Sequence, residues 1–262
     1  MILAGAGPGD PDLITIRAAQ WLQKADVVIT DRLVSNELLV RYVKAGAQII
    51  YAGKQSKHAG STPQSSINQM LVLHALQGKL VVRLKGGDVT IFSNILDELR
   101  TLTENNIPYE IVPGITAASG AAAYTGIPLT ARGHSTAVRF LTYYKADVIT
   151  QEYWKELSQT TDTLVFYMSS ETLDAVVGEL KKNNIGADKW LAVIEQATTP
   201  QQQVHCCSIR DYAVRLAGRQ YSSPSLVIIG KVAALYEQFK WVSPSASLRR
   251  LKQKEGFYVA AK

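Results

Sequence analysis

Cysteines and long apolar runs are scarce in this sequence, and their scarcity narrows the class of protein. The chain has only two cysteines, the adjacent pair Cys206 and Cys207, and neighbours in sequence are poorly placed to form a disulfide with each other. They favour a reducing compartment. No segment reaches the roughly 18 consecutive apolar residues that a membrane span needs. We therefore expect a protein without structural disulfides and without contact with a membrane.

A metal-binding pattern and a leader segment are also missing. The four histidines, His58, His74, His134 and His205, are scattered, with no His-x-x-x-His or Cys-x-x-Cys spacing. We therefore predict that no metal is bound. The chain starts with Met1-Ile2-Leu3 directly before a glycine loop, so no charged-then-apolar leader precedes the first strand. We expect a cytoplasmic protein.

The net charge of +6 leaves three kinds of partner open: nucleic acid, a polyanionic small molecule, or none beyond a basic surface. The basic residues form a tract only at 249–254, and no RNA-binding signature is present. Charge without a motif is weak support for a nucleic-acid partner. We therefore expect no nucleic acid, and a polyanionic small molecule remains open.

Short apolar segments alternate with helical patterns through the first half of the chain. We expect strands at residues 1–4, 27–30, 48–51, 80–84 and 110–112, and helices at 12–24, 36–45, 64–77 and 95–105. Such alternation is typical of a mainly parallel sheet that is covered on both faces.

At Pro113-Gly114 the composition changes. Residues 115–126 form a helical segment dense in alanine, serine and glycine. Further strands are expected at 138–143, 163–168, 190–195 and 225–229, with helices at 170–182 and 209–216. The fold class is therefore α/β with two α/β domains, residues 1–112 and 113–242. We interpret the basic tail, residues 243–262, as a frayed end.

Two glycine loops follow predicted strands, and both end in a carboxylate. They are Gly5-Ala6-Gly7-Pro8-Gly9-Asp10 and Lys85-Gly86-Gly87-Asp88. Glycine permits a positive φ and a close approach of backbone to a ligand. A P-loop is absent, and Asp10 occupies the place of the last glycine of a dinucleotide fingerprint. Because a carboxylate repels phosphate, the loops favour a ligand with ribose hydroxyls or positive charge.

Polar residues also follow two other strands. Asp31 comes directly after residues 27–30, and Lys54 follows residues 48–51 closely. Because the carboxyl ends of parallel strands share one edge of a sheet, we expect Pro8, Asp31, Lys54 and Asp88 to face the same rim. A carboxylate and an amine there can move protons. A surface ion pair is the alternative interpretation.

Several of these segments, taken in order, resemble the uroporphyrinogen-III C-methyltransferases of the tetrapyrrole methylase family. The resemblance rests on GAGPGDPDLITIRAA, ADVVITDRLVS, the Gly53-Lys54 step, VVRLKGGD, VPGITAASGAAAYTGIPLTAR and TLVFYM, and covers roughly residues 1–241. It implies the tetrapyrrole methylase fold, with two α/β domains and the active site in the cleft between them. It also implies a homodimer and S-adenosyl-L-methionine as the cofactor.

The implied reaction is double C-methylation of uroporphyrinogen III to precorrin-2, with S-adenosyl-L-homocysteine as the second product, for sirohaem or cobalamin synthesis. The substrate is a tetrapyrrole edged with carboxylates, which suits a basic protein. No part of the sequence resembles the extra domain that some sirohaem synthases use for oxidation and iron insertion. We therefore expect this chain to methylate only. The alternatives are a methyltransferase acting on a related corrin intermediate and a catalytically impaired cofactor-binding homologue.

The resemblance also implies roles for individual residues. Asp31 would be the proton acceptor and Lys54 the proton donor. Ala197 falls where the family usually has glycine. The full set implied to line the cofactor site is Pro8, Gly86, Gly87, Asp88, Ile91, Thr116, Ala117, Met168 and Ala197.

The sequence departs from the family directly after Asp88. The family usually continues with Pro-Phe-Ile-Phe-Gly-Arg-Gly-Gly-Glu-Glu, whereas residues 89–98 read VTIFSNILDE. The missing arginine is a partner for carboxylates, and the missing glycines leave a stiffer loop. Tyr143-Tyr144 stand where the family often has Gly-His, and Ser169 replaces a glycine. We expect cofactor binding to be largely intact and substrate binding to be altered.

Overall fold

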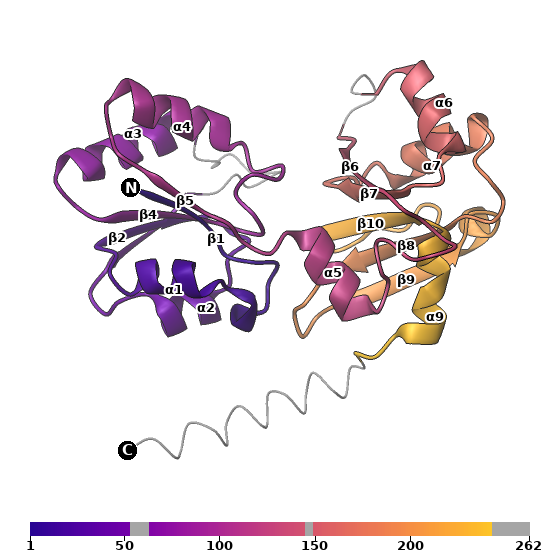
Figure 1. Cartoon of the computed structure of the whole chain (residues 1–262), viewed down its shortest axis with the longest axis horizontal. Helices are drawn as coiled ribbons and strands as arrows, with labels where there is room; N and C mark the ends of the chain where they lie inside the picture. Colours follow the sequence, from indigo (N-terminus) through magenta and orange to yellow (C-terminus); the bar gives the residue numbers. More distant parts are fainter. Residues whose placement is uncertain (53–62, 145–148, 243–262) are drawn as a thin grey trace, which may run out of the picture. The chain divides into compact units, whose positions relative to one another are not determined.

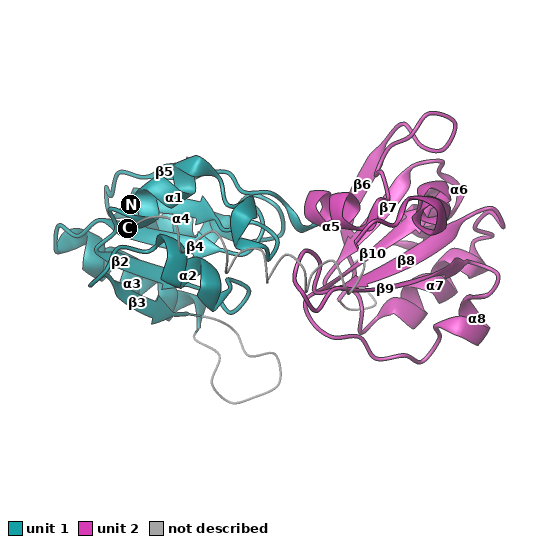
Figure 2. Ribbon diagram, turned by 90° about the horizontal axis from the view of Figure 1, so that it is seen from below, with its two compact units in different colours: residues 1–117 teal, residues 118–262 magenta. Residues whose placement is uncertain are grey.

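The computed structural model describes residues 1–52, 63–144 and 149–242. The chain divides into two compact units, Met1–Ala117 and Ala118–Lys262 (Figure 2). The sequence pattern places the boundary slightly earlier, after residue 112. The basic tail expected at 243–262 lies outside the described residues, as does Lys54.

Unit 1 is built on a five-stranded parallel sheet. Its strands are β1 (Ile2–Gly5), β2 (Val27–Thr30), β3 (Gln48–Tyr51), β4 (Val81–Lys85) and β5 (Glu110–Val112). Their order is β3-β2-β4-β1-β5, and every neighbouring pair is parallel. The parallel sheet expected for the first half of the chain is confirmed.

Helices cover both faces of this sheet. Figure 1 shows α1 (Ile16–Leu22) and α2 (Asn36–Tyr42) on one face, and α3 (Gln64–Leu76) and α4 (Ile95–Glu104) on the other. Side chains alternate between the two layers: Val28 packs with Leu22 and Leu38, and Ile29 packs with Leu71. Burial on both faces explains why the central strands read as continuous apolar runs.

The prediction of a single helix at 12–24 is wrong for the first part of this segment. Residues Pro11–Leu13 form a short 3-10 turn, η1, and α1 starts only at Ile16. The Asp10 side chain accepts a hydrogen bond from the Asp12 N–H (2.9 Å), and the Thr15 hydroxyl accepts one from the Ala18 N–H (3.3 Å). Two capping side chains so close together divide the segment into two pieces.

Unit 2 contains a mixed sheet rather than a parallel one. Its strands are β6 (Val138–Thr142), β7 (Thr163–Tyr167), β8 (Trp190–Glu195), β9 (Gln203–Ser208) and β10 (Ser225–Gly230). Their order is β6-β7-β10-β8-β9. Only β6 and β7 pair in parallel, and the other three pairs are antiparallel.

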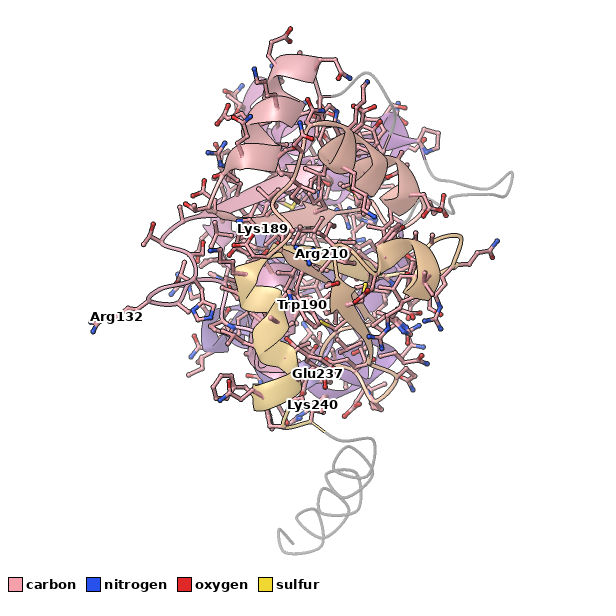
Figure 3. All side chains as sticks on the ribbon, turned by 90° about the vertical axis from the view of Figure 1, so that its right-hand side faces the viewer. Arg132, Lys189, Trp190, Arg210, Glu237 and Lys240 are labelled. Atoms are coloured by element: carbon pink, nitrogen blue, oxygen red, sulfur yellow. The ribbon has the colours of Figure 1, made fainter. Side chains whose placement is uncertain are left out.

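The helices of unit 2 are α5 (Ala117–Thr125), α6 (Gln151–Gln159), α7 (Leu173–Lys182), α8 (Tyr212–Arg215) and α9 (Tyr236–Phe239), with a 3-10 turn, η2, at Lys231–Leu235. Trp154, Phe166 and Leu180 belong to the core that joins α6, α7 and the sheet. Figure 3 shows Glu237 and Lys240 next to each other at α9, where their side chains form an ion pair of 2.7 Å. No helix within the described ranges is long and apolar enough to cross a membrane.

Candidate functional site

The turns that follow β1 and β4 are bonded to each other. The Ala6 N–H donates to the Lys85 carbonyl (2.8 Å). The Gly7 N–H donates to the Gly87 carbonyl (3.1 Å), and the Gly87 N–H donates back to the Gly7 carbonyl (2.7 Å). The connection from β1 to β2 and the connection from β4 to β5 cross the sheet in opposite directions. Such a switch point is where open parallel sheets bind ligands.

Glycine is required where these turns meet the segment after β5. A Cβ atom on Gly114 would lie 2.3 Å from the Gly87 carbonyl oxygen and 2.8 Å from the Gly5 Cα. A Cβ on Gly5 would lie 2.6 Å from the same oxygen. Gly87 has a φ of +70°, which side-chain-bearing residues rarely adopt. The two glycine loops singled out in the sequence are therefore parts of one structure, completed by Gly114.

Asp88 holds this structure together. Its side chain is 8% exposed, and its Oδ2 accepts a hydrogen bond from the Gly114 N–H (2.8 Å). Its Oδ1 accepts from the Thr90 N–H (2.7 Å) and the Thr90 hydroxyl (2.5 Å). Both oxygens are thus engaged in joining the turn after β4 to the segment after β5. A contact between Asp88 and a ligand stays a prediction.

Asp31 lies at the carboxyl end of β2 and faces the same turn. Its Oδ2 accepts a hydrogen bond from the Gly86 N–H (3.3 Å), and its Oδ1 accepts one from the Leu33 N–H (2.9 Å). The structure therefore brings Asp31 to the Gly86–Asp88 turn, as expected for strands that end at one edge. Lys54, the expected partner of Asp31 in proton transfer, lies outside the described residues.

Of the other predicted cofactor residues, four lie in unit 1. Pro8 stands between Gly7 and Gly9 in the first turn, and Ile91 follows the second turn; both are half-buried. Thr116 and Ala117 come just after Gly114, and the Ala117 nitrogen is 3.8 Å from where a Cβ on Gly87 would stand. These residues therefore belong to the segments that meet at the switch point.

Met168 and Ala197 lie in unit 2, at one end of its sheet. Met168 follows β7 and is 58% exposed, and Ala197 is in the turn after β8. Both strands run antiparallel to β10 and pair with its first residues, Ser225 and Leu226. Their carboxyl ends consequently lie at the same edge of the sheet. The Tyr167 hydroxyl accepts a hydrogen bond from the Ala118 N–H (3.1 Å), which joins this edge to α5.

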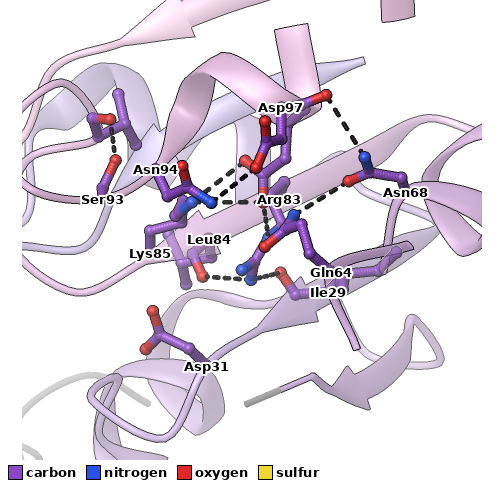
Figure 4. Close-up of polar contacts among 12 residues, drawn as sticks. Ile29, Asp31, Gln64, Asn68, Arg83, Leu84, Lys85, Ser93, Asn94 and Asp97 are labelled. Atoms are coloured by element: carbon purple, nitrogen blue, oxygen red, sulfur yellow. Dashed lines mark hydrogen bonds and ion pairs between the residues drawn. The ribbon is translucent and has the colours of Figure 1, made fainter. Parts of the chain in front are cut away.

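A buried ion cluster beside the turn was not foreseen from the sequence. Arg83 and Lys85 of β4 and Glu98 of α4 are 3%, 5% and 0% exposed. Arg83 Nε lies 2.9 Å from Glu98 Oε1, and Lys85 Nζ lies 3.2 Å from Glu98 Oε2. Figure 4 shows Arg83 and Lys85 together with Asp31. The sequence did carry a signal for this cluster: two cations lie within the otherwise apolar strand VVRLK, and a buried charge needs a partner.

The loop in which the sequence leaves the family has a strained backbone. Phe92 and Asn94 adopt left-handed conformations, with φ of 50° and 56°. Asparagine tolerates this region better than most residues, and Asn94 Nδ2 also donates to Asp97 Oδ2 (2.9 Å) in the first turn of α4. The Ser93 hydroxyl donates to the Val89 carbonyl. These local bonds hold a loop that lacks the family's glycines.

Two titratable side chains, Glu195 and His205, are also packed at the Ala197 edge of unit 2. Glu195 Oε1 lies 2.6 Å from His205 Nε2, and Glu195 Oε2 accepts a hydrogen bond from the Ser222 N–H (2.6 Å). Burial acts to raise the pKa of Glu195, but these hydrogen bonds outweigh burial and the pKa is lowered. By contrast, burial raises the pKa of Cys206 to about 12, so this thiol stays protonated.

Metal ligands do not gather in the part of the chain that the structure describes: it holds no group of three or more histidine, cysteine, aspartate and glutamate side chains placed to bind a metal ion. The candidate site in the described residues consists of backbone N–H and carbonyl groups, glycines and single carboxylates.

These features define a two-unit α/β protein with a candidate ligand site at the carboxyl ends of parallel strands. Residues 1–213 match the family model of the Tetrapyrrole (Corrin/Porphyrin) Methylases. The chain belongs to this family. The fold class expected from the resemblance is thereby confirmed, with a mixed sheet in unit 2.

Curated relatives carry the name siroheme synthase. The protein of that name from Vesicomyosocius okutanii is 44% identical over 240 residues, which is 91% of this chain and 51% of the relative. The one from Pseudomonas fluorescens is 44% identical over 246 residues, which is 94% of this chain and 52% of the relative. The chain therefore spans about half the length of the curated relatives it matches.

Solved structures of the same fold include uroporphyrin-III C-methyltransferase from Thermus thermophilus, with a TM-score of 0.75, 28% identity and coverage of 92% of this chain and 96% of that one. A structure of that enzyme in complex with S-adenosyl homocysteine has a TM-score of 0.71 and 28% identity, over 89% of this chain and 93% of that one. A cobalt precorrin-4 methyltransferase has a TM-score of 0.77 and 27% identity, over 88% and 95%.

Proposed function

We propose that the protein methylates uroporphyrinogen III at two ring carbons, forming precorrin-2 for sirohaem or cobalamin synthesis. S-adenosyl-L-methionine is the methyl donor, and S-adenosyl-L-homocysteine is released. The proposal also includes a homodimer, which the resemblance implies, and a cytoplasmic protein without a metal cofactor, as expected from the first residues and from the histidine and cysteine spacing. Family membership and the names of the relatives support the reaction class.

The observation that carries the proposal is the glycine structure at the switch point of unit 1. A Cβ on Gly5 or Gly114 would collide with neighbouring backbone, and Gly87 has a φ of +70° that side-chain-bearing residues rarely adopt. Backbone therefore comes close to a ligand at this point, and the carboxylates of Asp31 and Asp88 lie beside it, where they accept hydrogen bonds from the Gly86 and Gly114 N–H groups. Such a surface suits ribose hydroxyls and a cationic sulfonium better than a phosphate.

The cofactor contacts we propose are those that the resemblance implies. Pro8, the Gly86–Asp88 turn, Ile91 and the Thr116-Ala117 pair contribute from unit 1. Met168 and Ala197 contribute from the strand ends of unit 2. Bound S-adenosylmethionine supplies an electrophilic methyl group on its sulfonium. The contribution of these residues is to bind and align it with a ring carbon, because methyl transfer depends chiefly on alignment.

Proton transfer is assigned to Asp31 and Lys54. Asp31 accepts the proton that the ring loses after methylation, and its carboxylate is already oriented by the Gly86 and Leu33 N–H groups (3.3 and 2.9 Å). Lys54 donates a proton. A carboxylate positioned by two backbone N–H groups is suited to accept a proton repeatedly in one place.

A second candidate is methylation of a different tetrapyrrole or corrin intermediate. The similarity to a cobalt precorrin-4 methyltransferase supports it, at 27% identity over 88% of this chain. The loop at 89–94 supports it too, since it replaces the arginine and glycines of the resembled enzymes with Asn94 and other side-chain-bearing residues. A homologue that binds the cofactor without catalysis is the third candidate.

One assay separates these candidates. Purified protein is incubated anaerobically with uroporphyrinogen III and S-adenosylmethionine, and the product mass is followed. The proposal predicts a gain of two methyl groups. Cofactor binding, measured by calorimetry, without a gain in product mass would exclude it. Methylation of a corrin intermediate in place of uroporphyrinogen III would support the second candidate.

A further inference from the structure

The turn after β8 in unit 2 holds Ala197 between two residues with a left-handed backbone. Gln196 has a φ of 45° and Thr198 has a φ of 69°. Residues with a side chain rarely adopt this region, because the Cβ atom crowds the backbone, and none of residues 196–198 is glycine. Contacts from other residues must therefore hold the 196–198 turn in this conformation.

Gln202, the residue before β9, joins this turn to α5 through its side-chain amide. Its Oε1 accepts a hydrogen bond from the Thr198 N–H (2.8 Å), and its Nε2 donates to the Tyr124 carbonyl (3.3 Å). Because one partner is a donor and the other is an acceptor, the orientation of the amide is determined. Side chains of similar length cannot do both: an ionised glutamate has no donor, and a methionine has no donor and only a weak acceptor.

The other side of the turn is bonded independently of Gln202. The Gln196 N–H donates to the Pro224 carbonyl (2.7 Å). The Gln196 carbonyl accepts from the N–H and the hydroxyl of Thr199 (3.1 and 2.8 Å). Gln202 thus supplies the bond on the far side of Ala197, at the buried residue Thr198.

The end of α5 is a fixed anchor for this bond. The last carbonyls of a helix lack partners within the helix, and at this end they are satisfied from elsewhere in unit 2. The carbonyls of Ala122, Ala123 and Tyr124 accept from the Ile127 N–H (3.1 Å), Trp241 Nε1 (2.8 Å) and Gln202 Nε2 (3.3 Å), respectively. The helix begins at Ala117, another predicted cofactor residue. Gln202 therefore connects the Ala197 turn to an element that is itself part of the candidate site.

We propose that Gln202 is a positioning residue for the methyl donor: its amide holds the 196–198 turn in the left-handed conformation, so that the backbone at Ala197 is preformed for S-adenosylmethionine. This inference rests on the proposed function, in which the cofactor contacts Ala197. A turn that is not preformed has to be ordered when the cofactor binds, and this lowers the affinity. With the cofactor bound the turn is ordered either way, so kcat at saturating cofactor is unchanged.

The first test is Gln202→Met, which removes both hydrogen bonds and keeps the length of the side chain. Calorimetry should show the dissociation constant of S-adenosylhomocysteine rising about tenfold, the effect of losing a hydrogen bond of about 1.4 kcal/mol. The KM for S-adenosylmethionine should rise equally while kcat stays constant. Gln201→Met, the same change in the exposed neighbouring side chain, is the control and should leave both values at those of the parent.

The second test removes the need for the amide. Glycine adopts a positive φ without strain, so a Thr198→Gly protein depends less on Gln202 to hold its turn. In that background Gln202→Met should raise the dissociation constant by clearly less than it does in the parent. An equal rise in both backgrounds would mean that Gln202 contributes packing or stability alone, and would overturn the inference.

Gln202→Glu tests the same idea if Gln202→Met does not fold. It keeps the shape of the side chain and the acceptor for the Thr198 N–H but loses the donor for the Tyr124 carbonyl, so it should also bind S-adenosylhomocysteine more weakly. Folded variants with the affinity of the parent overturn the inference and leave the proposed function intact. A parent protein that does not bind S-adenosylhomocysteine overturns both.

Discussion

A side chain at Gly114 would disrupt the candidate site at its centre. In Gly114→Ala the new Cβ would lie 2.3 Å from the Gly87 carbonyl oxygen and 2.8 Å from the Gly5 Cα. Both neighbours are backbone atoms of tightly bonded turns, so no flexible side chain can move aside to relieve the overlap. The backbone after β5 has to shift away from the turn after β4.

The expected cost has two parts. Overpacking of this kind costs about 1–3 kcal/mol. The shift also weakens the hydrogen bond of 2.8 Å from the Gly114 N–H to Asp88, and a bond to a charged group contributes about 1.5–3 kcal/mol. We therefore expect the free energy of unfolding to fall by about 3 kcal/mol. The affinity for S-adenosylmethionine should fall by at least tenfold, about 1.4 kcal/mol.

The matched control is Gly178→Ala in α7. A Cβ at Gly178 meets nothing within 4 Å, so the same chemical change should stabilise the helix by about 0.5–1 kcal/mol. Urea unfolding measures the stability of both variants, and calorimetry measures cofactor affinity. A Gly114→Ala protein with the parent's stability and affinity would refute the claim that the three glycines build the site.

Three further predictions concern proton transfer, the altered loop and acid stability. Asp31→Asn and Lys54→Met should each lower kcat by about 10²–10⁴-fold and change the dissociation constant of S-adenosylmethionine little. Steady-state kinetics measures kcat, and calorimetry measures the dissociation constant. Variants with the parent's turnover would exclude the acid–base assignment. Asn94→Arg should lower KM for the tetrapyrrole by supplying a carboxylate partner, and an unchanged KM would count against a lost contact. The pKa of Glu195 is lowered from 4.5, so its stabilising contribution is present above pH 4.5 and is lost as the pH falls through its native pKa. Thermal unfolding of Glu195→Gln should accordingly differ most from the parent near neutral pH and least in acid.

The fold of unit 1 could be predicted well because its central strands are buried on both faces. The central strand expected at 27–30 is confirmed with the same bounds, and so are the more exposed edge strands expected at 48–51 and 110–112. Parallel strands buried in this way leave short apolar runs between polar helices, which the sequence shows directly. The error at α1 arose because capping by Asp10 and Thr15 interrupts a segment whose apolar spacing looks continuous.

Unit 2 was harder to predict. The edge strand β9 (Gln203–Ser208) is only partly buried, and its sequence QVHCCS has no apolar run. The helix α6 (Gln151–Gln159) is polar apart from the side that carries Trp154 and Leu157, and was overlooked. Antiparallel pairing of β8 with its neighbours depends on contacts between distant segments, which no local pattern specifies.

The sequence predicted several residues of the candidate site, but not how these residues come together in the fold. Glycine loops and the strand-end Asp31 are visible in the sequence, because turn chemistry is local. The approach of Gly114 to Gly5 and Gly87 is a tertiary contact. The ion cluster of Arg83, Lys85 and Glu98 was missed because charges in sequence ordinarily indicate a solvated surface. Only the structure shows that Glu98 of α4 meets the two cations of β4 and that all three side chains are buried.

The most direct test of the account follows the methyl groups themselves. The protein is incubated anaerobically with uroporphyrinogen III and S-adenosylmethionine labelled with carbon-13 in its methyl group, and the product is studied by NMR. The account predicts two labelled methyl groups, each bonded to a saturated carbon of the macrocycle. Label that remains in the cofactor, or that appears on oxygen or nitrogen, would contradict it.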